Sequence, residues 1–332
     1  MTFIGPAMRK LLLAAGSLLL LAFAAEALVW LRYPHDPVKF GAFFICFALV
    51  LGAFAGLADA RFIRQLREWA TGSAAAAFCI PFLLLVPYLI FAFGTGTFTA
   101  QGAGKLAAYI AVPVLLLAPD RLRHAARAGW RDYAAMLALA VPVAANWLTG
   151  IWTWPEDLYF FRPLYSVLIA GYAFMVIRNL EGVGYKLTVR WKDVTDALIN
   201  FIAFAIVAIP LGIALGFLHP HAEPVEAWSV GFQFVGIYLT IAIPEELLFR
   251  GILQNFLVRS IRSERRELYG LLIASVIFGA AHLHHAPVPN WRYMILATIA
   301  GVFYGNVFRT RRRVSASALT HTLVDTMWRF WL

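Results

Sequence analysis

Four residues in the last third of the chain could together carry out hydrolysis: Glu245, His282, His321 and Asp325. Each falls inside an apolar stretch, where an ionisable side chain costs at least about 2.5–3.5 kcal/mol to insert into lipid and therefore suggests function. His321 and Asp325 are four residues apart, so in a helix both project from one face. Carboxylates and imidazoles in a confined, dry layer can activate water and stabilise an oxyanion. We predict that these four residues are catalytic.

The neighbouring acid, Glu246, carries a different prediction. Arg250 lies four residues after it, and this order of acid and base favours an ion pair within one helix. Glu245 points about 100° away on a helix of 3.6 residues per turn and lacks that partner. We therefore predict that Glu245 is the reactive acid and that the Glu246/Arg250 pair supports it structurally. The alternative is a purely structural charge network.

Two mechanisms fit these residues. In a metal-free mechanism Glu245 is the general base, His282 holds the water, and His321 with Asp325 faces the oxyanion. In a metal-dependent mechanism Glu245, His282 and His321 bind zinc and leave one position open for water. The metal-free mechanism, with no cofactor, is preferred, because the ion pair predicted above places a cation beside Glu245 and the sequence has no closely spaced pair of histidine ligands.

The remaining histidines of this region give a weaker signal. His284 and His285 follow the apolar stretch that contains His282, and His219 and His221 precede the stretch that contains Glu245. They could form a separate metal site, but no tight ligand spacing supports it. For His284 and His285 an interfacial position is the preferred interpretation.

Membrane-spanning helices must position these side chains. Of the 332 residues 61% are hydrophobic and 14% are charged, against roughly 45–50% and about 25% in soluble proteins. The apolar residues form long blocks without the alternation of a β-barrel, and the two cysteines within them, Cys46 and Cys79, allow neither a disulfide framework nor a cysteine metal site. We predict an all-α, polytopic transmembrane bundle of about eleven spans, at residues 11–31, 40–58, 74–93, 106–118, 134–152, 164–177, 194–218, 228–258, 269–282, 293–308 and 314–332.

The basic residues indicate the orientation of these spans. With a cytoplasmic N-terminus, 21 of the 28 Lys and Arg residues lie in cytoplasmic segments and 6 lie outside, as the positive-inside rule requires. The C-terminus is then on the outer side, in a multi-pass protein of a bacterial inner membrane. The net charge of +10 is thus a topology signal rather than a sign of nucleic-acid binding. Arg9 and Lys10 precede an apolar run that ends in Ala22-Phe23-Ala24 and resembles a signal peptide with a small-residue cleavage site, so cleavage there is an alternative.

A polar segment divides the chain. Residues 178–193 form a predicted cytoplasmic connector between a six-span region, 1–177, of unknown role and a five-span region, 194–332, that contains the candidate catalytic residues. Those four residues lie 8 to 16 positions from the last predicted cytoplasmic arginine of an adjoining loop, or roughly 12–24 Å along a helix. We expect them to share one layer of the membrane.

Three ordered motifs in the last 140 or so residues resemble a known family. They read Glu245-Glu246-x-x-x-Arg250, Phe278-x-x-x-His282 and His321-x-x-x-Asp325. In this order, in successive motif-bearing spans, they are similar to the CPBP family of intramembrane proteases, the CAAX-prenyl-protease and bacteriocin-processing (ABI-type) group. The resemblance implies an endopeptidase that cleaves a membrane-associated or lipidated protein, with the first acid and both histidines catalytic and the role of metal open.

Asp325 departs from the family pattern, in which Asn is more usual. Because an ionised Asp cannot donate a hydrogen bond to an oxyanion, Asp325 is protonated, orients His321 or binds metal. Two further functions remain as alternatives to a protease: a proton- or cation-coupled transporter with these residues as its relay, and a non-catalytic scaffold or immunity protein of the same fold. Against transport, no inverted repeat relates the two halves.

Overall fold

The computed structural model of the protein contains helices and no strands in its described part, so the all-α prediction is confirmed there. The described residues are 32–33, 35–121, 127–221 and 224–332. The predicted span at 11–31, with its signal-peptide alternative, lies outside them. The chain forms two compact units, the described parts of Met1–Leu122 with Ala134–Arg178 (unit 1) and of Arg123–Tyr133 with Asn179–Leu332 (unit 2).

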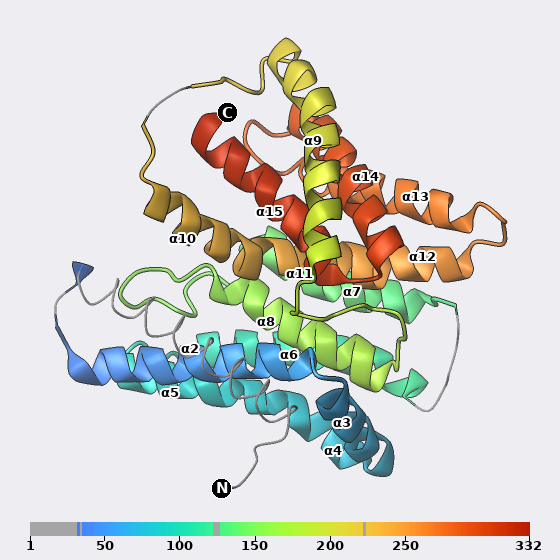
Figure 1. Ribbon diagram of the computed structural model, residues 1–332. Helices are drawn as coiled ribbons and strands as arrows, with labels where there is room; N and C mark the ends of the chain where they lie inside the picture. Colours follow the sequence, from blue (N-terminus) through green and yellow to red (C-terminus); the bar gives the residue numbers. More distant parts are fainter. Residues whose placement is uncertain (1–31, 34, 122–126, 222–223) are drawn as a thin grey trace, which may run out of the picture. The chain divides into compact units, whose positions relative to one another are not determined.

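Unit 1 is a bundle of mostly apolar helices. Its elements, drawn in blue to green in Figure 1, are α2 (Pro37–Leu57), α3 (Ala60–Gly72), α4 (Ala74–Cys79), η1 (Ile80–Leu84), α5 (Leu85–Thr95), α6 (Ala100–Leu117), η2 (Ala118–Asp120), most of α7 (Trp130–Ala144), α8 (Phe161–Ala170) and the π-helical η3 (Gly171–Ile177). α2 begins where Asp36 accepts hydrogen bonds from the amides of Val38 and Lys39, which satisfies donors that have no partner in the helix. Helix α2 packs along α5.

The contact between α2 and α5 depends on small residues. A Cβ at Gly94 of α5 would lie 2.2 Å from the Cβ of Ala42 in α2, closer than two carbon atoms can approach. Small residues allow helices in membranes to approach in this way. We expect Gly94→Ala to force the helices apart and to lower the free energy of unfolding by about 1–3 kcal/mol.

Thermal unfolding of the purified protein in detergent would measure this loss. Gly52→Ala is the matched control, because Gly52 lies within α2 and a Cβ added there would have nothing within 4 Å; this change should be neutral or stabilise by up to about 1 kcal/mol. Equal melting temperatures for the two variants would contradict the close contact.

One helix of unit 1 differs from the expectation for its segment. Residues 60–72, expected as a cytoplasmic connection, form α3. Its buried residues Ile63, Leu66 and Ala70 are spaced three and four apart, which places them on one face. Asp59 caps its first amides. The arginines between these positions led to the prediction of a polar connection, although the apolar residues follow the spacing of an amphipathic helix.

Several span boundaries also differ from the prediction. The segment expected at 106–118 begins earlier, as α6, because Thr99 caps the amide of Gly102. The segment expected at 134–152 ends at Ala144. Positive backbone φ angles at Asn146 (54°) and Gly150 (82°) take the chain out of the helix there.

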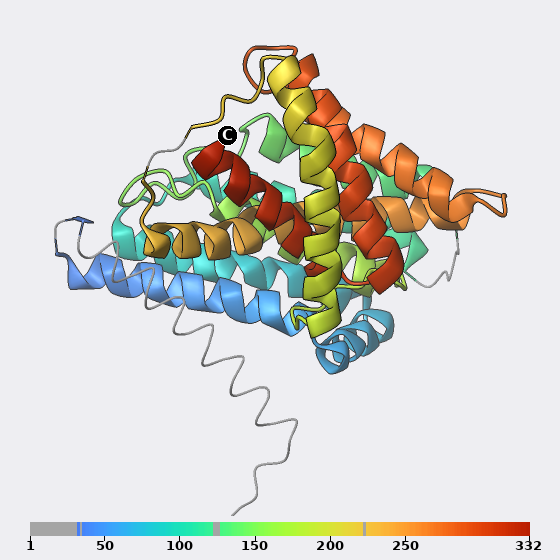
Figure 2. The same ribbon diagram turned by 45° about the horizontal axis from the view of Figure 1, so that its top comes forward.

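Unit 2 contains the candidate catalytic motifs. Its elements are α9 (Trp191–Ala214), α10 (Ala227–Ile237), η4 (Tyr238–Ala242), α11 (Ile243–Glu246), η5 (Leu247–Gln254), α12 (Asn255–Ser260), α13 (Arg266–Ala280), α14 (Trp291–Arg311) and α15 (Val314–Trp331). Helices α9, α14 and α15 pack against one another, and α13 packs along α14 (Figure 2). A core that includes Phe204, Phe278, Tyr304 and Val324 lies among them.

The polar segment before α9 belongs mainly to unit 2 and packs there against α12 and the start of α15. The amide of Val314 donates to the carbonyl of Gly184 at 2.9 Å, and Asn255 Nδ2 donates to the carbonyl of Glu181 at 2.8 Å. Arg313 Nε lies 3.1 Å from Asp193 Oδ2 and both side chains are buried. The division of the chain into functional domains at 178 and 193 remains a prediction.

Five helical stretches of the described chain are long and apolar enough to cross a membrane. They are Pro37–Leu57, Ala74–Thr95, Ala100–Asp120, Trp191–Ala214 and Ala227–Ser260. Phe161–Ile177 is a shorter apolar helix. These stretches indicate an integral membrane protein, while the count of eleven spans and the orientation of the termini remain predictions.

Candidate active site

The two adjacent acids lie in an irregular part of a continuous helical stretch. Ala227–Ser260 runs through α10, η4, α11, η5 and α12, and the short α-helical segment with Glu245 and Glu246 has a π-helical segment on each side. Pro244 contributes to this irregularity, because it has no amide N–H to donate within the helix. π-helical turns are frequent at functional sites. Here they set the directions in which the two acids point.

Glu246 is the centre of a buried polar cluster. Its carboxylate is inaccessible to solvent, and Oε2 lies 3.1 Å from Nε of Arg250. Oε1 lies 3.0 Å from Nδ1 of His321, and the hydroxyl of Ser317 donates to Oε2. The predicted Glu246/Arg250 ion pair is therefore present, and the same carboxylate also binds the third motif.

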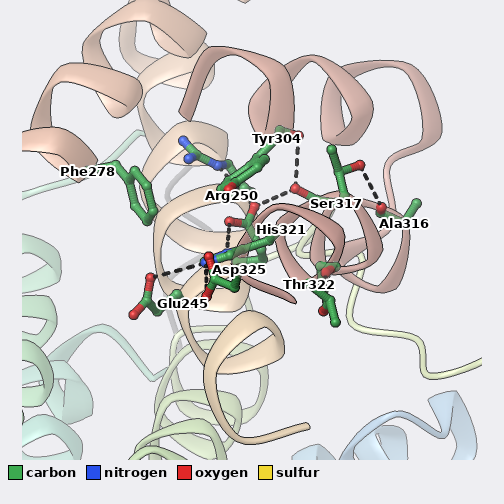
Figure 3. Close-up of polar contacts among 12 residues, drawn as sticks. Glu245, Arg250, Phe278, Tyr304, Ala316, Ser317, His321, Thr322 and Asp325 are labelled. Atoms are coloured by element: carbon green, nitrogen blue, oxygen red, sulfur yellow. Dashed lines mark hydrogen bonds and ion pairs between the residues drawn. The ribbon is translucent and has the colours of Figure 1, made fainter. Parts of the chain in front are cut away.

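His321 lies between carboxylates from two helices (Figure 3). Because a carboxylate only accepts, Nδ1 carries a hydrogen and donates it to Glu246. On the other side of the ring, Nε2 lies 3.4 Å from Oδ2 of Asp325 and 3.9 Å from Oε2 of Glu245. The ring of Tyr304 stacks on the imidazole with centroids 4.5 Å apart and planes at 15°. The imidazole is thus fixed in position by contacts on its edges and its face.

Glu245 contributes a carboxylate oxygen that accepts no hydrogen bond within the described chain. Its Oε2 is buried and has no hydrogen-bond partner among the described residues, although 35% of the side chain as a whole is exposed. The side chain of Asp325 is 24% exposed. Glu245 and Asp325 therefore lie on the accessible side of His321, while Glu246 lies on its buried side.

His282 occupies a different place from the one expected. The predicted span included it, but α13 ends at Ala280 and His282 lies in the following turn. Its Nδ1 lies 2.8 Å from the carbonyl oxygen of Phe278 and donates to it, which leaves Nε2 available in the neutral ring. No hydrogen bond or ion pair joins this imidazole to the other three candidates in the described chain. The aromatic ring of Phe278 connects the two histidines, 4.7 Å from His282 and 5.9 Å from His321 between centroids.

The neighbours of His282 form an aromatic group at the end of α13. The ring of Tyr293 lies 4.6 Å from His282 and 5.2 Å from His285. Burial, and then the nearby His284, lower the pKa of His285. His285 therefore stays neutral at neutral pH and adds no positive charge beside His282.

Arg250 is buried with only part of its guanidinium paired. Nη1 and Nη2 have no hydrogen-bond partner among the described residues. The guanidinium lies 5.1 Å from the ring centre of Phe278, a cation–π contact that offsets part of the cost of burial. Phe278 of the second motif thus contacts the Arg250 of the first and the His321 of the third.

Sequence reasoning missed two residues of this cluster. Ser317 lies four residues before His321, on the same face of α15, so its helical spacing could have identified it. Its hydroxyl reaches both Glu246 and the carbonyl oxygen of Tyr304, the latter at 2.8 Å. Tyr304 carries no motif, and only the packing of α14 against α15 reveals it.

The ligands of the alternative zinc site do not form a ready-made metal-binding group among the described residues. Among the described residues, no group of three or more His, Cys, Asp or Glu side chains is placed to hold a metal ion. This applies to Glu245 with His282 and His321, and also to the alternative around His284 and His285. The metal-free mechanism remains a prediction, and it is the one that we propose below.

Residues 227–327 match the family model of the type II CAAX prenyl endopeptidases, Rce1-like. The match includes all three motifs and covers less than a third of the chain. No curated protein and no solved structure matches the sequence.

Proposed function

We propose, from the presence of an Rce1-like endopeptidase domain, that the protein is an intramembrane protease that hydrolyses a peptide bond with water activated by Glu245. The domain match agrees with the resemblance to the CAAX proteases that the three motifs carry. The observation that carries the mechanism is the buried Oε2 of Glu245, which has no hydrogen-bond partner among the described residues and lies 3.9 Å from Nε2 of His321. A carboxylate with a free lone pair in a partly dry site can act as a general base.

The proposed reaction begins with proton transfer to Glu245. The carboxylate takes a proton from water as the water oxygen bonds to the carbonyl carbon of the substrate. Glu245 then gives that proton to the leaving amine as the carbon–nitrogen bond breaks. These two transfers balance and leave the enzyme unchanged.

His321 and Asp325 have separate proposed roles. Glu246 fixes the Nδ1 side of His321, so Nε2 is directed toward Glu245 and Asp325. With Nδ1–H donated to Glu246, a second hydrogen on Nε2 makes the ring an imidazolium, which the surrounding carboxylates stabilise. We propose that Nε2–H points to Asp325 in the resting enzyme, so that the ionised carboxylate orients the ring, and that it donates to the oxyanion as that charge develops. Of the options for Asp325, this one agrees best with the 3.4 Å contact.

His282 is proposed to position the attacking water or the peptide. Its Nδ1–H is engaged by the Phe278 carbonyl, so only Nε2 can bind a reactant. In the neutral ring that nitrogen accepts a hydrogen bond. We therefore assign His282 to holding water rather than to donating to the oxyanion.

The substrate is proposed to be a lipidated or membrane-associated protein, reached from the bilayer of a bacterial inner membrane. The match to a prenyl endopeptidase family and the candidate spans support a peptide substrate presented at the membrane. Cleavage of an internally quenched, prenylated peptide by the purified protein in nanodiscs tests this proposal. No cleavage of this peptide or of membrane-protein fractions by the folded protein would contradict it.

Ser317 should influence turnover through Glu246. Ser317→Ala removes the hydroxyl that holds the Glu246 carboxylate, and this carboxylate fixes His321. We expect kcat to fall by roughly tenfold with little change in KM, because the variant loses about one hydrogen bond to a charged group. Ser317→Thr should restore most of the rate. Steady-state kinetics on the quenched peptide measure both effects.

Thr322→Val is the matched control for that experiment. Thr322 is equally buried on α15, but its hydroxyl donates to the carbonyl of Ala318 in its own helix. It should retain the wild-type kcat. Equal losses in both variants would mean that Ser317 acts only through the stability of α15.

A metal-free reaction should be indifferent to chelators. We expect full activity after incubation with EDTA or phenanthroline and far less than one zinc per chain by elemental analysis, because Glu245, His282 and His321, all within the described chain, do not form a metal-binding group. Stoichiometric zinc that disappears in both His282→Ala and His321→Ala, with activity restored by added zinc only in the wild type, would replace this mechanism by the metal-dependent one.

A further inference from the structure

We propose that a basic cavity in unit 2, separate from the candidate active site, binds a phosphate group. The cavity has a volume of about 500 Å³ and is lined by Gly182, Gly184, Lys186, Asn255, Val258, Arg259, Arg266, Glu267 and Arg312. This volume is within the usual range for small-molecule sites. The lining contains four cationic side chains and a single acid.

Most of this positive charge is not neutralised by the protein. Arg312 pairs with Glu267 at 2.5 Å. Arg259 binds only neutral acceptors, the side chain of Asn255 at 3.2 Å and the carbonyl of Glu181 at 2.8 Å. The side chains of Lys186 and Arg266 make no hydrogen bond or ion pair within the described chain. The cavity therefore has about three uncompensated charges, and an anion would relieve their mutual repulsion.

The backbone around the cavity is held in a defined conformation. Gly184 has a φ of 69°, and a Cβ there would lie 2.5 Å from the carbonyl oxygen of Arg312, so a side chain would close this approach. Asn255 and Arg259 both bind the carbonyl of Glu181. The polar segment is thereby fixed against α12 and beside Arg312, with the cavity between them.

The chemistry of the lining favours phosphate over a carboxylate. Three of the four cations are arginines, whose planar forks match phosphate oxygens. Helix α13 begins at Arg266 and has 15 residues, so the positive end of its dipole adds to the same field. The basic residues belong to segments predicted to be cytoplasmic, and basic pockets between membrane helices on that side bind anionic headgroups. The phosphate could belong to a phospholipid or be free in solution.

Calorimetric titration of the full chain in detergent, after removal of co-purified lipid, tests the inference. The probes are dioctanoyl phosphatidylglycerol, zwitterionic dioctanoyl phosphatidylcholine and inorganic phosphate. The test variant is Lys186→Gln/Arg266→Gln, which removes two charges that have no partner in the described chain. The control is Arg262→Gln/Arg265→Gln, which removes two exposed arginines next to the cavity in sequence but outside its lining.

We expect the test variant to bind whichever anionic probe the wild type binds, phosphatidylglycerol or inorganic phosphate, roughly 25-fold more weakly, at about fivefold per charge. The control variant should bind that probe with the affinity of the wild type. This loss for phosphatidylglycerol alone identifies a lipid headgroup, and the loss for inorganic phosphate identifies a soluble ligand. Equal affinities in the test and control variants, or no binding of either anionic probe to the wild type, would overturn the proposal. If the double variant does not fold, Lys186→Gln alone, on an exposed side chain, should still weaken binding about fivefold. The inference is independent of peptide hydrolysis, so it can hold or fail whatever the outcome for Glu245.

Discussion

Glu245→Gln should abolish peptide cleavage while leaving the fold intact. The substitution keeps the shape of the side chain but removes its ability to accept a proton, so kcat should fall by roughly 10²–10⁴-fold. Oε2 of Glu245 has no hydrogen-bond partner in the described chain, and its one ion-pair contact there, with Nε2 of His321, is long at 3.9 Å, so the change should cost little stability. The quenched-peptide assay gives the rate, and thermal unfolding gives the stability.

Glu226→Gln is the control, because Glu226 lies exposed at the start of the same helical stretch. It should keep wild-type rate and melting temperature. Full activity in Glu245→Gln would end the assignment of Glu245 as the base. Loss of activity together with a large fall in melting temperature would instead mean that Glu245 is structural.

Arg250→Ala should strongly destabilise unit 2. The Glu246/Arg250 pair is inaccessible to solvent on both sides, and removal of one partner of a buried pair typically costs about 3–5 kcal/mol, because it leaves the other charge unpaired. Contacts with His321 and Ser317 hold the Glu246 carboxylate in the core, so in the variant it cannot readily move to solvent. Folded yield and the free energy of unfolding in detergent measure the effect.

A double variant distinguishes unpaired charge from lost packing. Glu246→Gln/Arg250→Met removes both charges of this pair and should be less destabilised than Arg250→Ala. Arg311→Ala is a partly exposed comparison, since the Arg311/Asp196 pair has side chains 28% and 23% exposed, and it should cost no more than about 1 kcal/mol. If the double variant lost as much as Arg250→Ala, the cost would lie in packing and not in the buried charge.

Local signals in the sequence were enough to predict the helical class, the family resemblance and the approximate positions of most helices. These signals are the length of apolar stretches and the four-residue spacing of polar side chains, which a helix converts directly into a shared face. The Glu246/Arg250 pair was predictable for this reason, since both partners lie on one helix. Helix caps and turns were harder to predict from local sequence, so the start of α6 and the end of α7 were misplaced. Helix α3 was missed.

Which motifs meet depends instead on tertiary packing. Contact between Glu246 and His321, 75 positions apart, depends on how α11 and α15 pack and on the π-helical segments around α11, which no local pattern specifies. The same packing recruits Tyr304 and Ser317 and sets His282 beyond the end of α13, joined to the cluster through Phe278. The basic cavity depends on the folding of a polar segment onto α12, where residues far apart in sequence bring their charges together. Side-chain direction across a helix contact depends on helix crossing and rotation, and these are properties of the assembled core.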